Sequence, residues 1–182
     1  TITGKVMTGK YESKQGESFI FQSPFNLQDI IEKLLQYSNN FIANQLFLTL
    51  GAASYGAPAS IEKGQRAILN FANSQLEIGT FRISEGSGLS RDNQVSPEQM
   101  MQILLEFSSY HYLLKKDKNG YYKTGTLNGI RTRAGYLEGL NGQLYPYVIM
   151  VNQSGANYNT ILNRLANRIN QLTQEPITKE IK

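Results

Sequence analysis

Two Asn-Gly dipeptides divide the second half of the chain into short runs of β-forming residues. Asn-Gly is typical of tight hairpin turns, because both central positions of that turn need a positive φ angle. The three runs around them are enriched in Tyr, Thr, Val and Ile, which favour strands. They span residues 121–127, 130–137 and 143–151, and the dipeptides lie at 128–129 and 141–142. Strands joined by hairpins pair as neighbours, so the sequence predicts a three-stranded antiparallel sheet.

The segments before and after this predicted sheet have the apolar periodicity of helices. Asn26 is placed to cap a first helix, in which Leu27, Ile30, Ile31, Leu34 and Leu35 would form one apolar stripe. After a polar interruption at 38–40, further helices are expected from Phe41 to Leu50 (ended by Gly51), from the cap Ser60 to Leu76, from Ser96-Pro97 to Phe107, and over 157–172.

The intervening segments are expected to be irregular, apart from a short strand over 18–21. Residues 51–59 have the composition of a loop, and residues 79–97 that of an irregular segment interrupted by glycines. The order of helices, strands and a closing helix predicts an α+β fold, forming one domain or part of one.

Composition excludes several kinds of site. The chain has no cysteine and one histidine, so thiolate metal sites, a Cys nucleophile and a multi-histidine site are excluded. His111 lies in an aromatic patch and is interpreted as structural. We expect neither a metal nor a cofactor.

Charge and hydropathy limit the partners. The net charge is +4, but the basic residues are scattered; the one cluster, Lys115, Lys116 and Lys118, is interpreted as a solvated loop, so nucleic acid is not an expected partner. No apolar run approaches the roughly 18 residues of a membrane span. The chain starts at Thr1 without a basic or apolar leader, so any targeting signal is expected outside it.

Two short motifs carry the chemistry. Lys123-Thr124-Gly125-Thr126 opens the first predicted strand, and Ser38-Asn39-Asn40 lies between two predicted helices. Lys-Thr-Gly and Ser-x-Asn elements, with an upstream Ser-x-x-Lys, are found in penicillin-binding proteins and class A β-lactamases. Each motif alone also has a structural interpretation. Ser38 and Asn40 would suit a helix cap, and Thr124 and Thr126 are good strand formers.

Longer stretches around these motifs resemble the low-molecular-mass (class C) penicillin-binding D-Ala-D-Ala carboxypeptidase/endopeptidase family. They are Tyr37–Ala43, Gly86–Asn93, Lys123–Gly129 and Ala134-Gly135-Tyr136, in this order. The resemblance covers about residues 20–170 and implies the C-terminal part of a β-lactamase/transpeptidase-like domain. It implies a strand or linker from the missing half over 1–22, the penicillin-recognition domain over 23–173, and a tail over 174–182.

The resemblance also implies roles for residues of the two motifs. Ser38 would relay a proton beside the lysine of Ser-x-x-Lys, and Asn40 would bind the substrate amide carbonyl. Lys123 would supply positive potential for the terminal carboxylate that Thr124 binds. Gly125 would let the substrate backbone lie along the strand, and the N–H of Thr126 would belong to the oxyanion hole. Ser87 and Ser90 are expected to be hydrogen-bonded loop residues.

The pattern departs from the family in two places. The half with the true Ser-x-x-Lys is absent, and the connection from Phe107 to Lys123 is short. Ser60-Ile61-Glu62-Lys63 reads as Ser-x-x-Lys, but it follows Ser-x-Asn instead of preceding it, and Ser60 is in a capping position. An enzyme using Ser60 in permuted order would need Ser60 close to Lys63 and Ser38.

The implied function is that of part of a serine-type D-Ala-D-Ala carboxypeptidase, which hydrolyses peptidoglycan stem peptides through an acyl-enzyme. Its partners would be stem peptides ending in D-Ala-D-Ala, β-lactams and the missing N-terminal half. Its location would be the periplasm or cell envelope, and this chain alone would be inactive. The alternative is a non-catalytic peptidoglycan- or partner-binding module of the same fold.

Overall fold

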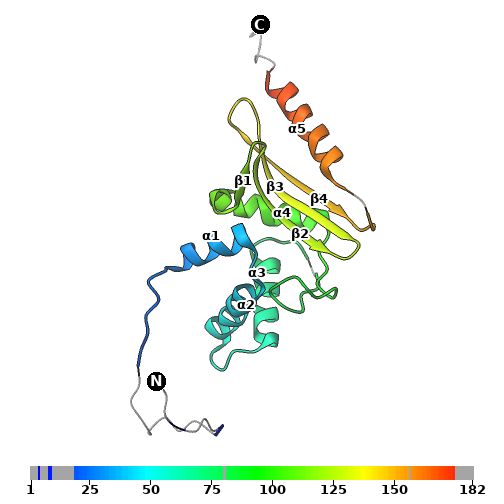
Figure 1. The fold of residues 1–182 in the computed structure, drawn as a ribbon. Coiled ribbons are helices and arrows are strands. Elements are labelled where there is room, and N and C mark those ends of the chain that lie inside the picture. Colours follow the sequence, from blue (N-terminus) through cyan, green and yellow to red (C-terminus); the bar gives the residue numbers. More distant parts are fainter. Residues whose placement is uncertain (1–3, 5–7, 10–18, 80, 156, 175–182) are drawn as a thin grey trace.

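The computed structural model describes residues 4, 8–9, 19–79, 81–155 and 157–174. A four-stranded antiparallel sheet is flanked by helices (Figure 1), which confirms the predicted α+β fold. In chain order the elements are α1 (Leu27–Tyr37), α2 (Asn40–Tyr55), α3 (Ile61–Ser74), α4 (Pro97–Phe107), the 3₁₀ helix η1 (Ser108–Leu113), β1 (Lys115–Asp117), β2 (Gly120–Leu127), β3 (Ile130–Glu138), β4 (Leu144–Val151) and α5 (Asn159–Gln174).

The sheet has the strand order β1-β2-β3-β4, and the three predicted strands are confirmed as β2, β3 and β4. Residues 128–129 alone connect β2 to β3, and Gly129 has the positive φ of 75° that this turn needs. β1 was not predicted. Lys115 and Lys116 pair with Tyr122 and Tyr121, so the expectation of a basic loop is wrong. Backbone pairing forms this strand, while both lysine side chains stay exposed.

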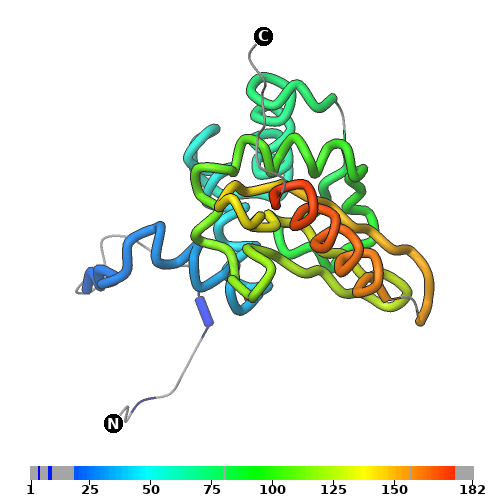
Figure 2. Tube along the Cα trace, turned by 90° about the horizontal axis from the view of Figure 1, so that it is seen from above, coloured from blue at the N-terminus to red at the C-terminus, as the bar shows by residue number. Residues whose placement is uncertain are grey.

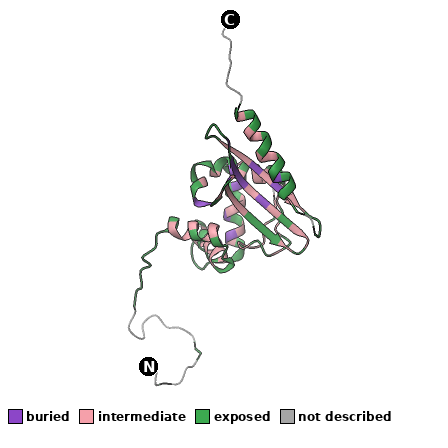
Figure 3. Ribbon diagram, turned by 45° about the horizontal axis from the view of Figure 1, so that its top comes forward, coloured by how far each residue is buried: buried purple, intermediate pink, exposed green. Residues whose placement is uncertain are grey.

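Each face of the sheet carries an apolar cluster, so the core lies on both sides of the strands (Figure 3). On one face Leu137 and Tyr147 pack with Leu162 of α5. On the other, Tyr136 packs with Leu104 of α4 and with Leu114. Figure 2 shows α5, orange to red, lying over the strands. This packing fixes β2 and β3 from both faces.

The helices α2 and α3 form a close pair beside the sheet. The prediction that Gly51 ends the second helix is wrong, because α2 continues through it to Tyr55. A Cβ at Gly51 would lie 2.4 Å from the backbone N of Gly64, and the missing side chain of Gly64 makes room for the Phe47 ring. Both glycines therefore serve helix packing, and the loop begins only at Gly56.

The helix starts largely agree with the sequence. Asn26 and Ser96 form capping boxes with Asp29 and Gln99, and Ser60 caps α3. Residues 81–95 are irregular apart from one bridge between Arg82 and Gln94, as expected.

The two ends of the chain were predicted less well. Phe19, Ile20 and Phe21 belong to no strand, because no described strand lies beside them to complete their backbone hydrogen bonds; they are 92%, 95% and 87% exposed. Ser18 and the other calls on residues 1–3, 5–7, 10–18 and 175–182 lie outside the described residues. The expected tail included Gln174, which is the last residue of α5.

Candidate functional site

A cleft of about 1000 Å³ lies between the helical pair and the sheet. Its walls are the α1–α2 junction, the irregular segment 86–95, and β2 with the adjoining part of β3. All six residues singled out in the two sequence motifs line it: Ser38, Asn40, Lys123, Thr124, Gly125 and Thr126. The fold therefore brings the two motifs together in one cavity.

Ser38 lies at the C-terminal end of α1, where the chain turns into α2. It has a φ of 58°, and its N–H donates to the Leu34 carbonyl at 2.9 Å. The side chain that caps α2 belongs to Asn39, whose Oδ1 accepts from the Ile42 N–H at 3.0 Å. The capping interpretation of Ser38 and Asn40 is thus wrong, because Asn39 performs that role. Ser38 and the exposed Asn40 present their side chains at the cleft.

Lys123 joins the two sides of the cleft. Its Nζ donates a hydrogen bond to Ser38 Oγ, across a separation of 85 residues in sequence. The same ammonium donates to the Thr124 carbonyl at 3.2 Å. Burial lowers the pKa of the Lys123 ammonium, because the charged form loses solvation. The ammonium of Lys123 on β2 therefore meets Ser38 of the α1–α2 junction within the cleft.

One edge of β2 is open along the cleft. β1 pairs only with Gly120, Tyr121 and Tyr122, so among the described strands none covers the outer edge of residues 123–127. Thr124, Gly125 and Thr126 are exposed there. On the inner side, a Cβ at Gly125 would lie 2.5 Å from Thr132 Oγ1, so the glycine also serves cross-strand packing. An open strand edge offers backbone N–H and C=O groups to an extended peptide.

The irregular segment that walls the cleft is held by side chains of residues 84–93. The Glu85 carboxylate accepts hydrogen bonds from the Ser87 hydroxyl and N–H, from the Ser90 N–H, and from Asn93 Nδ2. Burial acts to raise the pKa of Glu85, but these bonds, led by the one from the Ser87 hydroxyl, outweigh it and lower the pKa to about 2. Ser87 and Ser90 are hydrogen-bonded loop residues, as predicted.

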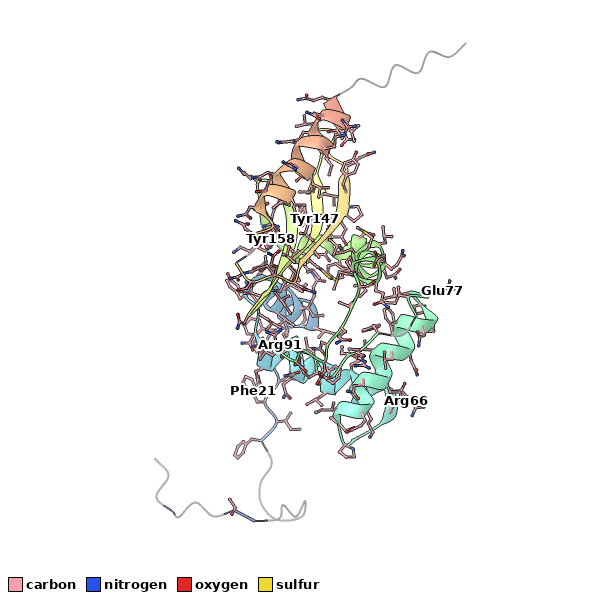
Figure 4. The ribbon with its side chains drawn as sticks, turned by 90° about the vertical axis from the view of Figure 1, so that its right-hand side faces the viewer. Phe21, Arg66, Glu77, Arg91, Tyr147 and Tyr158 are labelled. Carbon is pink, nitrogen blue, oxygen red and sulfur yellow. The ribbon has the colours of Figure 1, made fainter. Side chains whose placement is uncertain are left out.

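Two contacts fix this wall to its neighbours. The Gly86 N–H donates to Asn44 Oδ1 of α2 at 2.8 Å, and Arg91 Nη2 donates to the Asn128 carbonyl in the β2–β3 turn at 2.6 Å. Figure 4 shows Arg91 between the helical pair and the sheet. Sequence analysis assigned no role to Glu85 or Arg91, although Arg91 lies in the stretch Gly86–Asn93 that carries the family resemblance. Glu85, just before that stretch, had no signal beyond the glycine-rich composition of the segment.

The Ser60 motif is not a catalytic pair. Ser60 Oγ accepts from the Lys63 backbone N–H at 3.3 Å, and Lys63 Nζ donates to the carbonyls of Gly56 and Pro58 at 2.7 and 2.8 Å. Neither residue lines the cleft with Ser38. The structure therefore contradicts the permuted-enzyme hypothesis and supports the capping interpretation.

His111 is also part of the fold and not of the cleft. Its ring packs edge-on against Tyr121 with a centroid separation of 4.7 Å, and Nδ1 lies 2.8 Å from the Ser108 carbonyl. Within the described ranges, no group of three or more His, Cys, Asp or Glu side chains is arranged to hold a metal ion. No described helix combines the length and the apolar character needed to cross a membrane.

Comparison with known proteins places these features in context. A model of the D-Ala-D-Ala carboxypeptidase 3 (S13) family matches residues 1–115, which include Ser38 and Asn40 and end before β2. D-alanyl-D-alanine carboxypeptidase DacB of Haemophilus influenzae is 26% identical over 83% of this chain. The chain spans 36% of the length of that relative.

Solved structures extend the similarity to the fold. Penicillin binding protein 4 of Haemophilus influenzae, complexed with a β-lactam, matches with a TM-score of 0.68 at 23% identity, over 81% of this chain and 41% of its own. The TLA-3 extended-spectrum β-lactamase matches with a TM-score of 0.57 at 16% identity, over 81% of this chain and 64% of its own. The fold is therefore the β-lactamase-like fold that sequence analysis predicted.

Proposed function

Because the chain belongs to the D-Ala-D-Ala carboxypeptidase 3 (S13) family, we propose that it forms one side of the active site of a serine-type D-Ala-D-Ala carboxypeptidase. In this proposal the chain supplies the Ser-x-Asn and Lys-Thr-Gly walls, and the serine nucleophile of Ser-x-x-Lys comes from the upstream part of the protein. The chain alone is then inactive. The observation that carries the proposal is the hydrogen bond from Lys123 to Ser38 across the cleft.

The open edge of β2 suits a peptide substrate. An extended stem peptide would lie along residues 123–127 as an added strand, with its terminal carboxylate near Lys123 and Thr124. Asn40, on the opposite wall, would bind the amide carbonyl of the peptide. The N–H of Thr126 would donate to the oxyanion, and such a donor is worth roughly 3–4 kcal/mol of transition-state stabilisation.

The hydrogen bond between Lys123 and Ser38 supports a proton relay. Ser38 Oγ accepts from the lysine, so its own hydrogen is available to another acceptor. In acyl transfer the attacking serine loses a proton, and the leaving amine of D-Ala gains one. Ser38 would pass this proton as the C–N bond breaks, leaving an acyl-enzyme that water then hydrolyses. The lowered pKa of Lys123 helps, because its proton is held less tightly than usual.

Substrates, partners and location follow from the same proposal. The substrates would be peptidoglycan stem peptides ending in D-Ala-D-Ala, and β-lactams would acylate the same serine. The relative of known structure is named as a penicillin-binding protein, which is consistent with this chemistry. The periplasm or cell envelope would be its location.

The test is the mass gained from a fluorescent penicillin, measured on the protein that contains this chain with its upstream part and on this chain alone. We expect one adduct on the longer protein and none on the chain. Lys123→Gln should slow acylation of the longer protein by about 100-fold or more, the range for loss of a positioned proton-transfer group. Ser60→Ala is the matched control and should acylate at the normal rate, since Ser60 only caps α3.

Three results would count against the proposal. An adduct on this chain alone would place a nucleophile within residues 1–182. Normal acylation of the Lys123 variant would remove the proposed role of the lysine. Absence of any adduct on the longer protein would favour the alternative, a non-catalytic peptidoglycan-binding module.

A further inference from the structure

A second, smaller recess of about 220 Å³ adjoins the cleft where β1 begins at Lys115. It shares Ser38, Lys123 and Thr124 with the cleft, so the two cavities meet at the open edge of β2. The remaining lining residues come from α1, β1, β2, β3 and the residue just before α5: Leu35, Gln36, Lys115, Tyr122, Arg133 and Tyr158. Sequence analysis assigned no function to any of these six.

The lining of the recess is basic, although one of its cations, Arg133, is paired with Asp117. Lys115, Lys123 and Arg133 line it, and none of its lining residues is Asp or Glu. Hydroxyl groups of Ser38, Thr124, Tyr122 and Tyr158 complete the lining. A volume of this size holds a small ligand group and not a peptide chain. Its charge and its hydroxyls are suited to an anion.

Arg133 is held rigidly at the base of this recess. Its residue is only 8% exposed. Nε donates to the Tyr147 hydroxyl at 2.7 Å, Nη2 donates to Asp117 Oδ2 at 2.6 Å, and the guanidinium lies 3.6 Å from the centroid of the Tyr122 ring. Tyr147 and Tyr158 lie on the same side of the sheet (Figure 4). No described residue accepts from Nη1. Such a fixed guanidinium is well suited to bind a planar carboxylate.

The register of the sheet aligns Arg133 with Thr124. The two residues are direct partners between β2 and β3, so their side chains lie on the same face, whereas Lys123 is opposite Ala134 on the other face. The Lys123 ammonium is already engaged by Ser38 Oγ and the Thr124 carbonyl. Arg133 is paired with Asp117 through Nη2, but its Nη1 keeps N–H donors on the face that carries the Thr124 hydroxyl.

We propose that Arg133, with Lys115 and the Thr124 hydroxyl, forms the direct binding site for the terminal carboxylate of the substrate, while Lys123 serves Ser38. The proposal rests on the proposed function for the identity of the substrate. Asp117 and Tyr147 are positioning residues that hold the guanidinium. Lys115 is exposed and adds positive potential at the mouth of the recess.

The test compares binding of two short N-acetylated peptides to the protein that contains this chain with its upstream part. One peptide ends in D-Ala-D-Ala with a free carboxylate, and the other ends in the carboxamide. Binding measured by calorimetry needs no acylation. Arg133→Gln should weaken binding of the carboxylate by about 10- to 100-fold, the range for a hydrogen bond to a charged group. Binding of the carboxamide should change little.

Control variants separate recognition from stability. Arg131→Gln removes an exposed arginine two positions away that does not line the recess, and it should leave the preference for the carboxylate unchanged. Arg133→Gln leaves Asp117 without its ion pair and could fail to fold. In that case Lys115→Gln and Thr124→Val, both at exposed positions, provide the measurement, and both should reduce the preference.

Each outcome bears on one proposal at a time. An unchanged preference in the folded variants, or equal weakening for both peptides, would overturn the carboxylate site. If the longer protein also forms a penicillin adduct, that result would overturn only the carboxylate site and would still support the proposed function. A carboxylate preference that is lost with Arg133, in a protein that forms no adduct, would support the site and count against the enzyme.

Discussion

Replacing Gly51 with alanine tests the packing of α2 on α3, which carries one wall of the cleft. The new Cβ would lie 2.4 Å from Gly64 N and 2.7 Å from the Lys63 carbonyl carbon, where ordinary contact is 3.4–4 Å. Both contacted atoms are backbone atoms, so the helices must separate by about 1 Å to restore ordinary contact. Overpacking of this kind costs about 3 kcal/mol at the upper end of its range.

A smaller effect acts in the opposite direction. Alanine is favoured over glycine in a helix by about 1 kcal/mol. The packing term is larger, so Gly51→Ala should lower the free energy of unfolding by about 2 kcal/mol and the melting temperature by about 4–8 °C. Thermal unfolding followed by circular dichroism is the assay. Thr49→Ala, at an exposed position of the same helix, is the control and should change stability by less than about 0.5 kcal/mol.

A Gly51→Ala variant as stable as the original would refute this reasoning. It would mean that α2 and α3 move apart without loss of packing energy, and that the higher helix propensity of alanine determines the change in stability. A variant more stable by about 1 kcal/mol would lead to the same conclusion.

Two further predictions concern the segment that walls the cleft. The pKa of Glu85 is lowered to about 2, so its stabilising contribution is present above its ordinary pKa of 4.5 and is lost as pH falls toward 2. Glu85→Gln should therefore cost about 2 kcal/mol near neutral pH, and urea unfolding should show a flatter pH dependence between 5 and 2; an unchanged pH profile would contradict this. Arg91→Ala should cost less than about 1 kcal/mol because the contact to Asn128 is exposed. It should nevertheless speed amide hydrogen exchange in the β2–β3 turn at Gly129, and unaltered exchange there would show that the contact does not hold the turn.

The elements predicted best are those with strong local signals. The three strands carry Asn-Gly turns between β-forming runs, and the starts of α1, α3 and α4 carry capping residues, so local chemistry specifies them. β1 has no turn or capping signal in the sequence. It is only three residues long, and its pairing with β2 is what forms it. The predicted helix end at Gly51 was wrong for a similar reason, because a tertiary contact decides the role of this glycine. Glycine commonly follows a helix end, and only the proximity of Gly64 explains it within a helix.

The candidate site was predictable in its members but not in its connections. Ser38 and Lys123 were identified from motifs, but their hydrogen bond links two residues far apart in sequence. Arg133 could not be identified, because an arginine in a strand has no sequence signal of its own. Its significance comes from Asp117, Tyr147 and the register with Thr124, which belong to three other strands. Tertiary pairing thus supplies the chemistry that local patterns leave undetermined.

The hydrogen bond from Lys123 to Ser38 bears on where the nucleophile of the proposed enzyme would enter the cleft. Ser38 Oγ accepts from Lys123 on the β2 side, so its hydrogen points away from that strand. This hydrogen turns about the Cβ–Oγ bond and can reach an acceptor on the side of the cleft that Asn40 and the segment around Gly86 form. A serine entering there would have the Thr126 N–H across the cleft and the peptide between them. Under the proposed function, the completing Ser-x-x-Lys would then lie near the start of α2, the helix that packs on α3 through Gly51.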